Sequence, residues 1–282
     1  MALEFIKESW GDRFPGPQPI SIERRHFPLL KKQPYFLCEK TDGVRHLLVS
    51  IADGVFLINR ALSLTLVRGI RIPKETLLDG DLVESKTGKF IFVIHDAVRV
   101  KGEDLRLGPL NARLDKARGL VKGIIKTAGA SFEIRVKTMV PLEQAREFPP
   151  LDSFEYETDG VILTPVNEPI RSGTHETMFK WKPHDRITID FELKMGNELY
   201  IQDRGNPIRM SEMHLGNRRP DLPSGTIVEC GHGSLGWFVE KVRTDKTHPN
   251  NLRTYERTLV NLREDIKLAE LIEAVSQQTM SA

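Results

Sequence analysis

Residues 39–45 read EKTDGVR and place Lys40 between carboxylates, beside a glycine turn and ahead of Arg45. A lysine amine in this setting is a candidate nucleophile toward phosphorus. Lysine is a hydrated cation at neutral pH, so it attacks only where burial or neighbouring cations favour its neutral form. Alone, so short a string equally fits a solvated turn between two strands, and the choice depends on motifs further along the chain.

Five more short motifs occur in order: residues 78–82 (LDGDL), 92–97 (FVIHDA), 158–162 (TDGVI), 179–183 (FKWKP) and 243–246 (RTDK). With Lys40 at its head, this ordered set resembles the covalent nucleotidyltransferases, the superfamily of mRNA capping guanylyltransferases and polynucleotide ligases. Residues 14–24, 226–231 and 253–259 match outside the motifs and favour the capping branch. Within it, the chain is most similar to the compact, single-function capping guanylyltransferases of chlorella viruses.

The resemblance implies an mRNA guanylyltransferase, which transfers GMP from GTP to the 5′-diphosphate end of RNA through a covalent lysyl-N-GMP intermediate and forms the GpppN cap. Each of the two displacements at the same phosphorus needs an activated nucleophile, surrounding cations and in-line geometry. Two alternatives remain: an ATP-dependent polynucleotide ligase, or a catalytically dead OB-fold RNA-binding protein. Covalent labelling with GTP or ATP separates all three.

Lys180 and Lys182 lie one residue apart on an expected strand, so both face the same side if Trp181 faces the other. Such a pair would neutralise an α-phosphate, whereas a lysine-rich strand edge that discourages aggregation is the alternative reading. Placement after the 158–162 motif favours catalysis. The catalytic residues that the resemblance implies are Lys40, Asp159, Lys180, Lys182, Arg243, Asp245 and Lys246.

For the nucleotide, the resemblance implies that His95 and Ile162 sandwich the guanine, that Lys137 donates to its O6 atom and that Arg60 binds the ribose. Relatives usually carry phenylalanine or tyrosine in place of His95, and a core histidine at a strand end is the competing reading. The full GTP-binding set is Glu39, Thr41, Arg45, Arg60, Asp81, His95, Lys137, Ile162, Lys180, Lys182, Arg243 and Lys246.

Asp81, Asp159 and Asp190 are the expected ligands of Mg²⁺ or Mn²⁺, which prefer hard oxygen donors together with phosphates and water. The family's third motif usually ends in glutamate, and Asp81 is one methylene shorter. We therefore expect Asp81 to reach the metal through a water molecule. Asp79 is expected to be a turn residue or to support the residues that contact the metal and nucleotide, rather than to bind the metal itself.

The elements that position these residues are mostly short strands. Alternation and turn residues predict strands at 35–40, 45–51, 55–59, 77–83, 90–96, 132–140 and 160–164, then 187–194, 199–202, 226–230 and 237–242. Helical spacing predicts helices at 111–126 and 267–278. The first has a basic face, expected to be solvated, that carries Arg113, Lys116, Arg118, Lys122 and Lys126.

The fold class expected is α+β. The resemblance implies an ATP-grasp-like nucleotidyltransferase domain of antiparallel sheets with helices over 1–186, an OB-fold β-barrel lid over 187–264, and a C-terminal helix over 265–282 that packs back on the first domain. Closely spaced strands after residue 183 independently suggest a small barrel.

The composition fits this reading. With 282 residues, 39% hydrophobic, and a net charge of +2, the chain is long enough for two domains but too weakly charged to bind RNA through its overall field. It lacks a run of about 20 apolar residues and a signal-peptide layout, so no membrane partner is expected. Two cysteines, Cys38 and Cys230, suggest an intracellular location: the nucleus, or the host nucleus or cytoplasm for a viral protein.

No motif of an RNA triphosphatase or of a methyltransferase is present in the sequence. We therefore expect separate enzymes to remove the γ-phosphate and to methylate the cap, and RNA polymerase is a candidate partner.

Overall fold

The computed structural model describes the backbone of residues 2–10, 14, 16–127 and 129–276, and the side chains of all of these except 8–10, 215, 275 and 276. The chain divides into two compact units. The first comprises Met1–Ile20, His26–Trp181 and Ile272–Ala282, and the second comprises Ser21–Arg25 and Lys182–Leu271. The division expected from sequence, at 186/187 and 264/265, remains a prediction.

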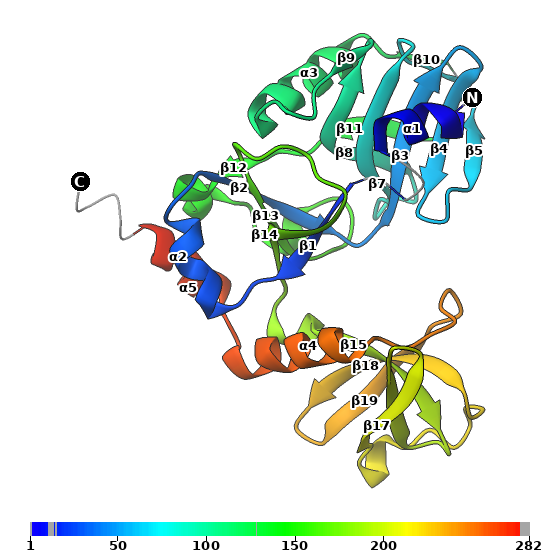
Figure 1. The fold of residues 1–282 in the computed structure, drawn as a ribbon, viewed down its shortest axis with the longest axis vertical. Helices are drawn as coiled ribbons and strands as arrows, with labels where there is room; N and C mark the ends of the chain where they lie inside the picture. Colours follow the sequence, from blue (N-terminus) through cyan, green and yellow to red (C-terminus); the bar gives the residue numbers. More distant parts are fainter. Residues whose placement is uncertain (1, 11–13, 15, 128, 277–282) are drawn as a thin grey trace. The chain divides into compact units, whose positions relative to one another are not determined.

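A smaller sheet of the first unit carries the lysine motif, and its strand order is β1-β14-β13-β2-β12 (Figure 1). The ladders that join β12, β2, β13 and β14 are antiparallel. The strands are β1 (Pro17–Ser21), β2 (Tyr35–Thr41), β12 (Val140–Pro141), β13 (Thr158–Pro165) and β14 (Gly173–Trp181).

A larger sheet of the same unit has the order β11-β8-β7-β3-β4-β5, and its β11–β8 ladder is parallel. Its strands are β3 (Val44–Ile51), β4 (Gly54–Asn59), β5 (Leu64–Val67), β7 (Thr76–Glu84), β8 (Phe90–Val100) and β11 (Glu133–Val136), with β9 (Glu103–Asp104) against β8; β6 (Ile70–Arg71) pairs with β10 (Ile125–Lys126) separately.

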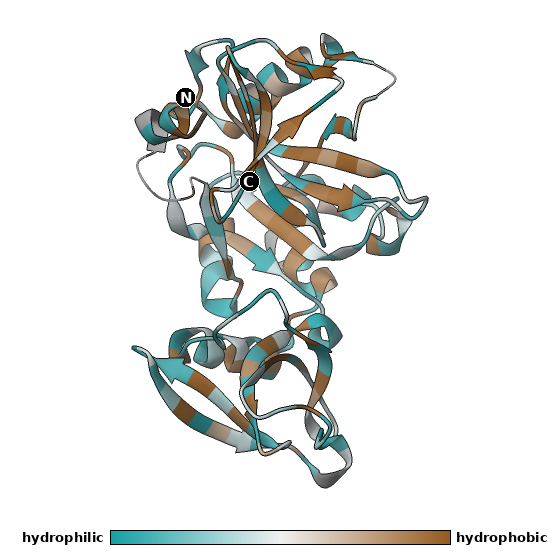
Figure 2. Cartoon of the chain, turned by 90° about the vertical axis from the view of Figure 1, so that its right-hand side faces the viewer, coloured by the Kyte–Doolittle hydropathy of each residue, from teal (hydrophilic) through white to brown (hydrophobic). Residues whose placement is uncertain are grey.

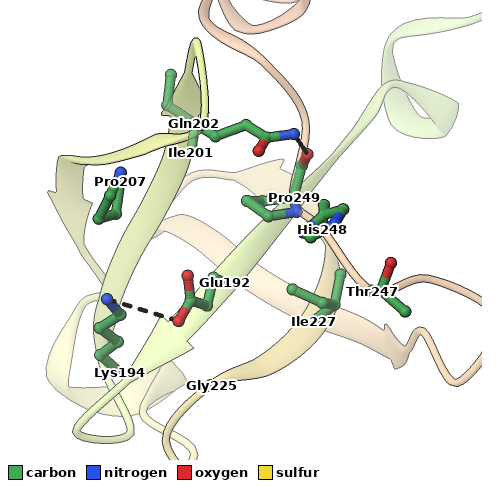
Figure 3. Close-up of a pocket in the computed structure, with 11 residues that line it drawn as sticks. Glu192, Lys194, Ile201, Gln202, Pro207, Gly225, Ile227, Thr247, His248 and Pro249 are labelled. Atoms are coloured by element: carbon green, nitrogen blue, oxygen red, sulfur yellow. Dashed lines mark hydrogen bonds and ion pairs between the residues drawn. The ribbon is translucent and has the colours of Figure 1, made fainter.

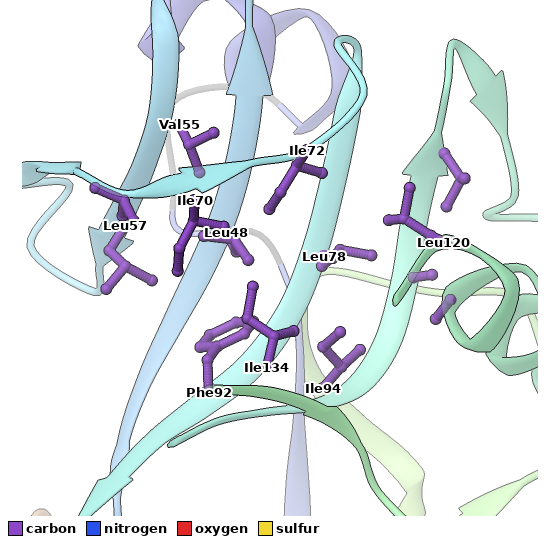
Figure 4. Packing of buried hydrophobic residues seen from close by; sticks show 14 of the residues in the cluster. Leu48, Val55, Leu57, Ile70, Ile72, Leu78, Phe92, Ile94, Leu120 and Ile134 are labelled. Carbon is purple, nitrogen blue, oxygen red and sulfur yellow. The ribbon is translucent and has the colours of Figure 1, made fainter. Parts of the chain in front are cut away.

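Helices cover the larger sheet on both faces. On one face, α3 (Leu110–Lys122) packs on a core that includes Leu48, Leu78, Phe92 and Ile94 (Figure 4). On the other face, α1 (Ala2–Trp10) buries Ile6 in a second cluster. Alternate residues of one strand thus contribute to two cores. Figure 2 shows long hydrophobic segments, in brown, along the strands. The short α2 (Phe27–Leu30) follows a 3₁₀ turn at Arg24–His26.

The second unit contains an antiparallel sheet of order β17-β16-β15-β18-β19. Its strands are β15 (Thr188–Lys194), β16 (Glu198–Asp203), β17 (Asn206–Glu212), β18 (Thr226–Gly233) and β19 (Gly236–Val242). Among the described residues no ladder joins β17 to β19, so the five strands form an OB-like sheet open at that edge. The α+β class is confirmed.

Helix α4 (Leu252–Glu264) covers the core of the second unit with Tyr255, which packs edge-on against Phe191. Its N-terminal amides are capped by Asn251, whose side chain accepts from the Thr254 amide at 2.9 Å. It ends where Asp265 adopts a left-handed conformation. The last helix, α5 (Leu268–Ser276), begins one residue later than the 267–278 expected, and residues 277 and 278 lie outside the described residues.

Three sequence expectations need correction. The helix expected at 111–126 ends at Lys122, because Gly123 follows it and Ile125–Lys126 joins a β-ladder. Arg113 is buried rather than solvated, because Asp96 of β8 accepts two hydrogen bonds from its guanidinium at 2.7 and 2.9 Å. The strand expected at 132–140 is interrupted after Val136.

Candidate functional site

The lysine motif lies where the smaller sheet passes into the larger one. Lys40 is near the end of β2, and the turn at Asp42–Gly43 leads into β3. A side-chain carbon built on Gly43 would lie 2.5 Å from Cγ1 of Val83 and 2.9 Å from the Leu82 carbonyl oxygen. Glycine is therefore needed for the turn to approach β7 this closely.

Lys40 meets Asp159 across the β2–β13 ladder. Gly160 pairs with Lys40 and Thr158 with Thr41, so Asp159 is the extra residue of a β-bulge. Bulges redirect a side chain without ending the pairing. Here the Lys40 amine donates to Oδ1 of Asp159 at 2.6 Å, and the two side chains are 23% and 12% exposed. The amine is thus held by a carboxylate while still reachable from solvent.

Lys180 faces the same side of this sheet as Lys40. The register pairs Ile162 with Lys180 on one side and with Cys38 on the other, and Cys38 is two residues from Lys40. Trp181 is buried and points the other way, as the sequence suggested. The structure therefore brings Lys40, Ile162 and Lys180 onto one face, and Lys182 follows directly after β14.

A buried polar cluster adjoins the motif. Lys137 donates to the Glu39 carbonyl at 3.0 Å and to the Thr41 hydroxyl at 3.2 Å, and its amine is 3.6 Å from Asp81. Thr41 in turn donates to Asp81 at 2.5 Å. Tyr156 donates to the Glu39 carboxylate at 2.9 Å.

Attraction between opposite charges outweighs burial in setting the pKa values of this cluster. Burial alone would raise the pKa of Asp81, but Lys137, the Thr41 hydroxyl and Arg45 outweigh it and lower that pKa to about 2. Burial alone would lower the pKa of Lys137, but the neighbouring Cys38, Asp81 and Glu39 together raise it. Opposite charges therefore hold both groups in their ionised forms.

A second polar cluster centres on Asp79. Both of its oxygens accept from the Arg45 guanidinium, at 2.9 and 2.5 Å, and Arg45 also donates to the Pro17 carbonyl at 2.6 Å. His95 lies 3.4 Å from Asp79 and is the extra residue of a bulge in β8. Burial lowers the pKa of His95, which favours the neutral ring. Arg60 comes directly after β4, near Arg45 and the carboxylates.

Two supporting residues make contacts that the motifs alone do not show. Asp79, expected as a turn residue or as a support for the site residues, joins Arg45 to His95. Tyr156 was not singled out, because its contact with Glu39 spans 117 residues. The sequence around it, residues 155–159, carries no pattern that would indicate such a contact.

The second unit holds the remaining motif residues. Arg243 donates to Asp190 at 2.8 Å and to both oxygens of Asp245, at 2.8 and 2.7 Å. Lys246 also pairs with Asp190. Both Asp190 oxygens therefore accept from cations. Metal ligation by Asp190 stays a prediction, and a metal there would have to displace Arg243 and Lys246.

The described residues hold no cluster of three or more histidine, cysteine, aspartate or glutamate side chains suited to a metal ion. Mg²⁺ typically binds through one or two carboxylates plus substrate phosphates. Asp159, a hard oxygen donor beside Lys40, fits that mode, as does Asp81.

A cavity of about 310 Å³ opens in the second unit, and Thr247, which directly follows the 243–246 motif, is one of the residues that line it (Figure 3). Glu192 and Lys194 line it and pair with each other at 3.5 Å, and Gln202 donates to the Pro249 carbonyl at 3.4 Å. None of the residues singled out from the sequence lines this cavity. We assign it no part in the chemistry, because its charged lining residues neutralise each other.

No helix within the described residues combines the length and the apolar character that crossing a membrane requires.

Two family models match nearly the whole chain. The model described as mRNA capping enzyme, catalytic domain, matches residues 2–184, and that described as mRNA capping enzyme, C-terminal domain, matches residues 190–272.

Among curated relatives, an mRNA-capping enzyme subunit alpha of Eremothecium gossypii is 30% identical over 92% of this chain and 77% of its own length. That of Schizosaccharomyces pombe is 28% identical over 93% and 79%. An mRNA-capping enzyme of Danio rerio is 24% identical over 84% of this chain, which spans only 45% of that protein. Among solved structures, a mycobacterial DNA ligase D complexed with ATP and MES matches this chain with a TM-score of 0.47 and 13% identity. The match covers 82% of this chain and 97% of the ligase chain.

Proposed function

Because the chain belongs to the mRNA capping enzyme family, we propose that it is an mRNA guanylyltransferase. It transfers GMP from GTP to the 5′-diphosphate end of RNA through a covalent intermediate on Lys40. The observation that carries this proposal is the Lys40 amine, held 2.6 Å from Asp159 and on one sheet face with Lys180.

In the first step, the Lys40 amine attacks the α-phosphorus of GTP, a phosphorus–nitrogen bond forms and pyrophosphate leaves. An ammonium has no lone pair, so Lys40 must first lose a proton, and Asp159 is the hydrogen-bonded acceptor beside it. In the second step, a β-phosphate oxygen of the RNA attacks the same phosphorus. The amine leaves, takes back a proton, and the cap is formed.

Cations around the phosphates would stabilise both transition states. We assign Lys180 and Lys182 to the α-phosphate. Arg243, held by Asp245, and Lys246 would act on the β- and γ-phosphates as part of a lid. The family's divalent metal, Mg²⁺ or Mn²⁺, would be held by Asp159 and Asp81 together with substrate phosphates and would neutralise charge on the triphosphate. Asp190 stays a candidate ligand.

The remaining motif residues would select the nucleotide. Lys137 would donate to guanine O6, and adenine carries an amino group at that position, so the mismatch leaves polar groups unpaired. His95 and Ile162 would flank the base, and Arg60 would bind the ribose. Glu39, Thr41 and Arg45 complete the pocket, since they hold Lys137 and Asp79 in place.

The wider setting is part of the same proposal. A separate RNA triphosphatase would supply the diphosphate end, a separate methyltransferase would act on the cap, and RNA polymerase is a candidate partner. The enzyme would work inside the cell, in the nucleus, or in the host nucleus or cytoplasm for a viral protein.

The test is incubation of the chain with α-labelled GTP or ATP and a divalent metal, followed by denaturing gel electrophoresis. We expect covalent label from GTP and none from ATP. The Lys40→Ala variant should give no label, and Lys32→Ala, an exposed lysine outside the site, should label normally. Label from ATP alone would indicate a ligase, and label that persists on Lys40→Ala would refute the assigned nucleophile.

A further inference from the structure

Phe238 is an exposed aromatic side chain on β19, 37% accessible, next to the buried Trp237. It pairs with Gly231 of β18. A side-chain carbon built on Gly231 would lie 2.8 Å from Cζ of Phe238, and one built on Gly233 would lie 3.4 Å from its Cε1. The ring therefore rests on two glycines that leave room for it, while its other side faces outward.

Basic side chains lie close enough to this part of the sheet to act on its carboxylates. Lys182, Arg186 and Lys241 all act electrostatically on Glu240, whose side chain also lies against Gly231. Lys241 is in addition 3.4 Å from Glu229. The β-ladder pairs Lys241 with Glu229, two residues from Gly231 on β18, which places Lys241 on the face that carries Phe238. Phosphates that bind here must compete with these carboxylates, so the binding should be weak and sensitive to salt.

We propose that this surface, the Phe238 platform (Phe238, Gly231, Gly233, Arg186 and Lys241), stacks a base of the acceptor RNA near its 5′ end. The inference rests on the proposed function and names where its second substrate binds. OB folds commonly bind single strands by combining a stacking aromatic with a basic groove. Stacking reads no base edge, which suits an enzyme that acts on many different 5′ ends.

A purely structural role of Phe238 must be distinguished from base stacking. An aromatic ring across from glycine also shields the glycine backbone and stabilises strand pairing. Phe238→Leu keeps an apolar cover over Gly231 but removes the π-face on which a base stacks. Phe238→Trp enlarges that face.

The experiment measures binding of a short 5′-diphosphate oligoribonucleotide to the full chain by fluorescence anisotropy without GTP, and the KM for this RNA in GMP transfer. Phe238→Leu should weaken binding and raise the KM about tenfold, whereas Phe238→Trp should bind at least as tightly as the wild type. The control Leu235→Ala, an exposed residue of the same hairpin, should change neither value. Abasic substitutions near the 5′ end should weaken wild-type binding by the same factor and add no further loss to Phe238→Leu.

Unaltered RNA binding by Phe238→Leu would overturn the platform. So would an abasic penalty equal in the variant and the wild type, because the lost base would then stack elsewhere. The result is separable from the proposed function. A wild-type chain that takes no label from GTP, yet binds RNA in a Phe238-dependent manner, would refute guanylyl transfer and leave the platform standing.

Discussion

At the scale of single residues, the site depends on charges that are buried but compensated. Lys137 has a side chain only 2% exposed, and its amine lies between the Glu39 carbonyl, the Thr41 hydroxyl and the Asp81 carboxylate. Removing one partner of a buried pair leaves the other charge without compensation, which costs far more than the pair contributes when intact. Lys137 should therefore stabilise the fold as well as select guanine.

The Lys137→Met variant tests the structural part of this argument. It preserves side-chain length but leaves Asp81 and Glu39 without their cation, so the free energy of unfolding should fall by about 3 to 5 kcal/mol. Urea titration followed by circular dichroism measures the change. Lys126→Met, at an exposed lysine, should alter the unfolding free energy by less than about 0.5 kcal/mol. Equal stability of the two variants would contradict the compensation argument.

The sequence identified the residues of the candidate site better than it identified the side chains that contact them. Lys40, Asp159 and Lys180 were singled out by motif order, and the register places Lys40 and Lys180 on one face of the sheet with Asp159 bonded to Lys40. Arg113 was expected in solvent because its helix face looked basic, whereas Asp96 of a distant strand buries it. Long-range partners leave no local pattern, so neither this pair nor the Tyr156–Glu39 contact was predictable.

At the scale of elements, close packing and β-bulges shape the site. The bulges at Asp159 and His95 each add one residue to a strand beside a motif, and alternation in the sequence cannot reveal such an insertion. The strands themselves were mostly predicted, since apolar alternation is local. The range 132–140 shows one limit, because the chain leaves the sheet after Val136 and places Lys137 beside Glu39. Strand β17 (Asn206–Glu212) was not predicted at all.

Gly80 illustrates how tightly β7 is packed. A side-chain carbon built there would lie 2.6 Å from the Val93 carbonyl oxygen and 2.7 Å from Cζ of Phe92. Gly80→Ala should therefore destabilise the chain by about 1 to 3 kcal/mol, measured as a lower urea midpoint. The matched change Gly119→Ala, in an open position of α3, should stabilise it by about 0.5 to 1 kcal/mol. If both variants moved the urea midpoint in the same direction, close packing around Gly80 would not explain the effect of Gly80→Ala.

Strand β14 contains a buried histidine, His175, that can change its protonation state with pH. Its ring lies 3.8 Å from the Glu168 carboxylate and 3.1 Å from the Thr177 hydroxyl. Burial lowers the pKa of His175 below its ordinary value of 6.5, although Glu168 opposes this. The unfolded chain therefore takes up the proton first as the pH falls. The stability that neutral His175 contributes is present above pH 6.5 and is lost as the pH drops through the folded-state value.

We expect urea midpoints of the wild type to fall between about pH 7.5 and about pH 5, and His175→Gln to remove part of that dependence. His214→Gln, at an exposed histidine, should retain it. A steeper fall in His175→Gln than in the wild type would show that the folded state holds His175 as a cation, contrary to the burial argument.

At the scale of the whole molecule, the proposed chemistry calls on residues of both compact units. Lys40 and Asp159 belong to the first unit, whereas Arg243 and Lys246 belong to the second. Within the second unit, hydrogen bonds to Asp245, together with the charges of Asp190 and Glu229, raise the pKa of Arg243 and fix its charge. If Arg243 acts on the β- and γ-phosphates, it contributes only while the nucleotide still carries them.

This dependence gives a step-specific prediction for Arg243→Ala. Loss of one charged donor to a transferring phosphate typically costs about 100-fold, so the rate of Lys40 labelling by GTP should fall by about that factor. Enzyme labelled during a long incubation, then freed of GTP and mixed with 5′-diphosphate RNA, should transfer its GMP with a much smaller defect, because pyrophosphate has already left. Arg218→Ala, an exposed arginine of the same unit, should behave as the wild type in both steps. Equal losses in the two steps would mean that Arg243 acts on the α-phosphate or on the fold, and circular dichroism of the variant would separate those two causes.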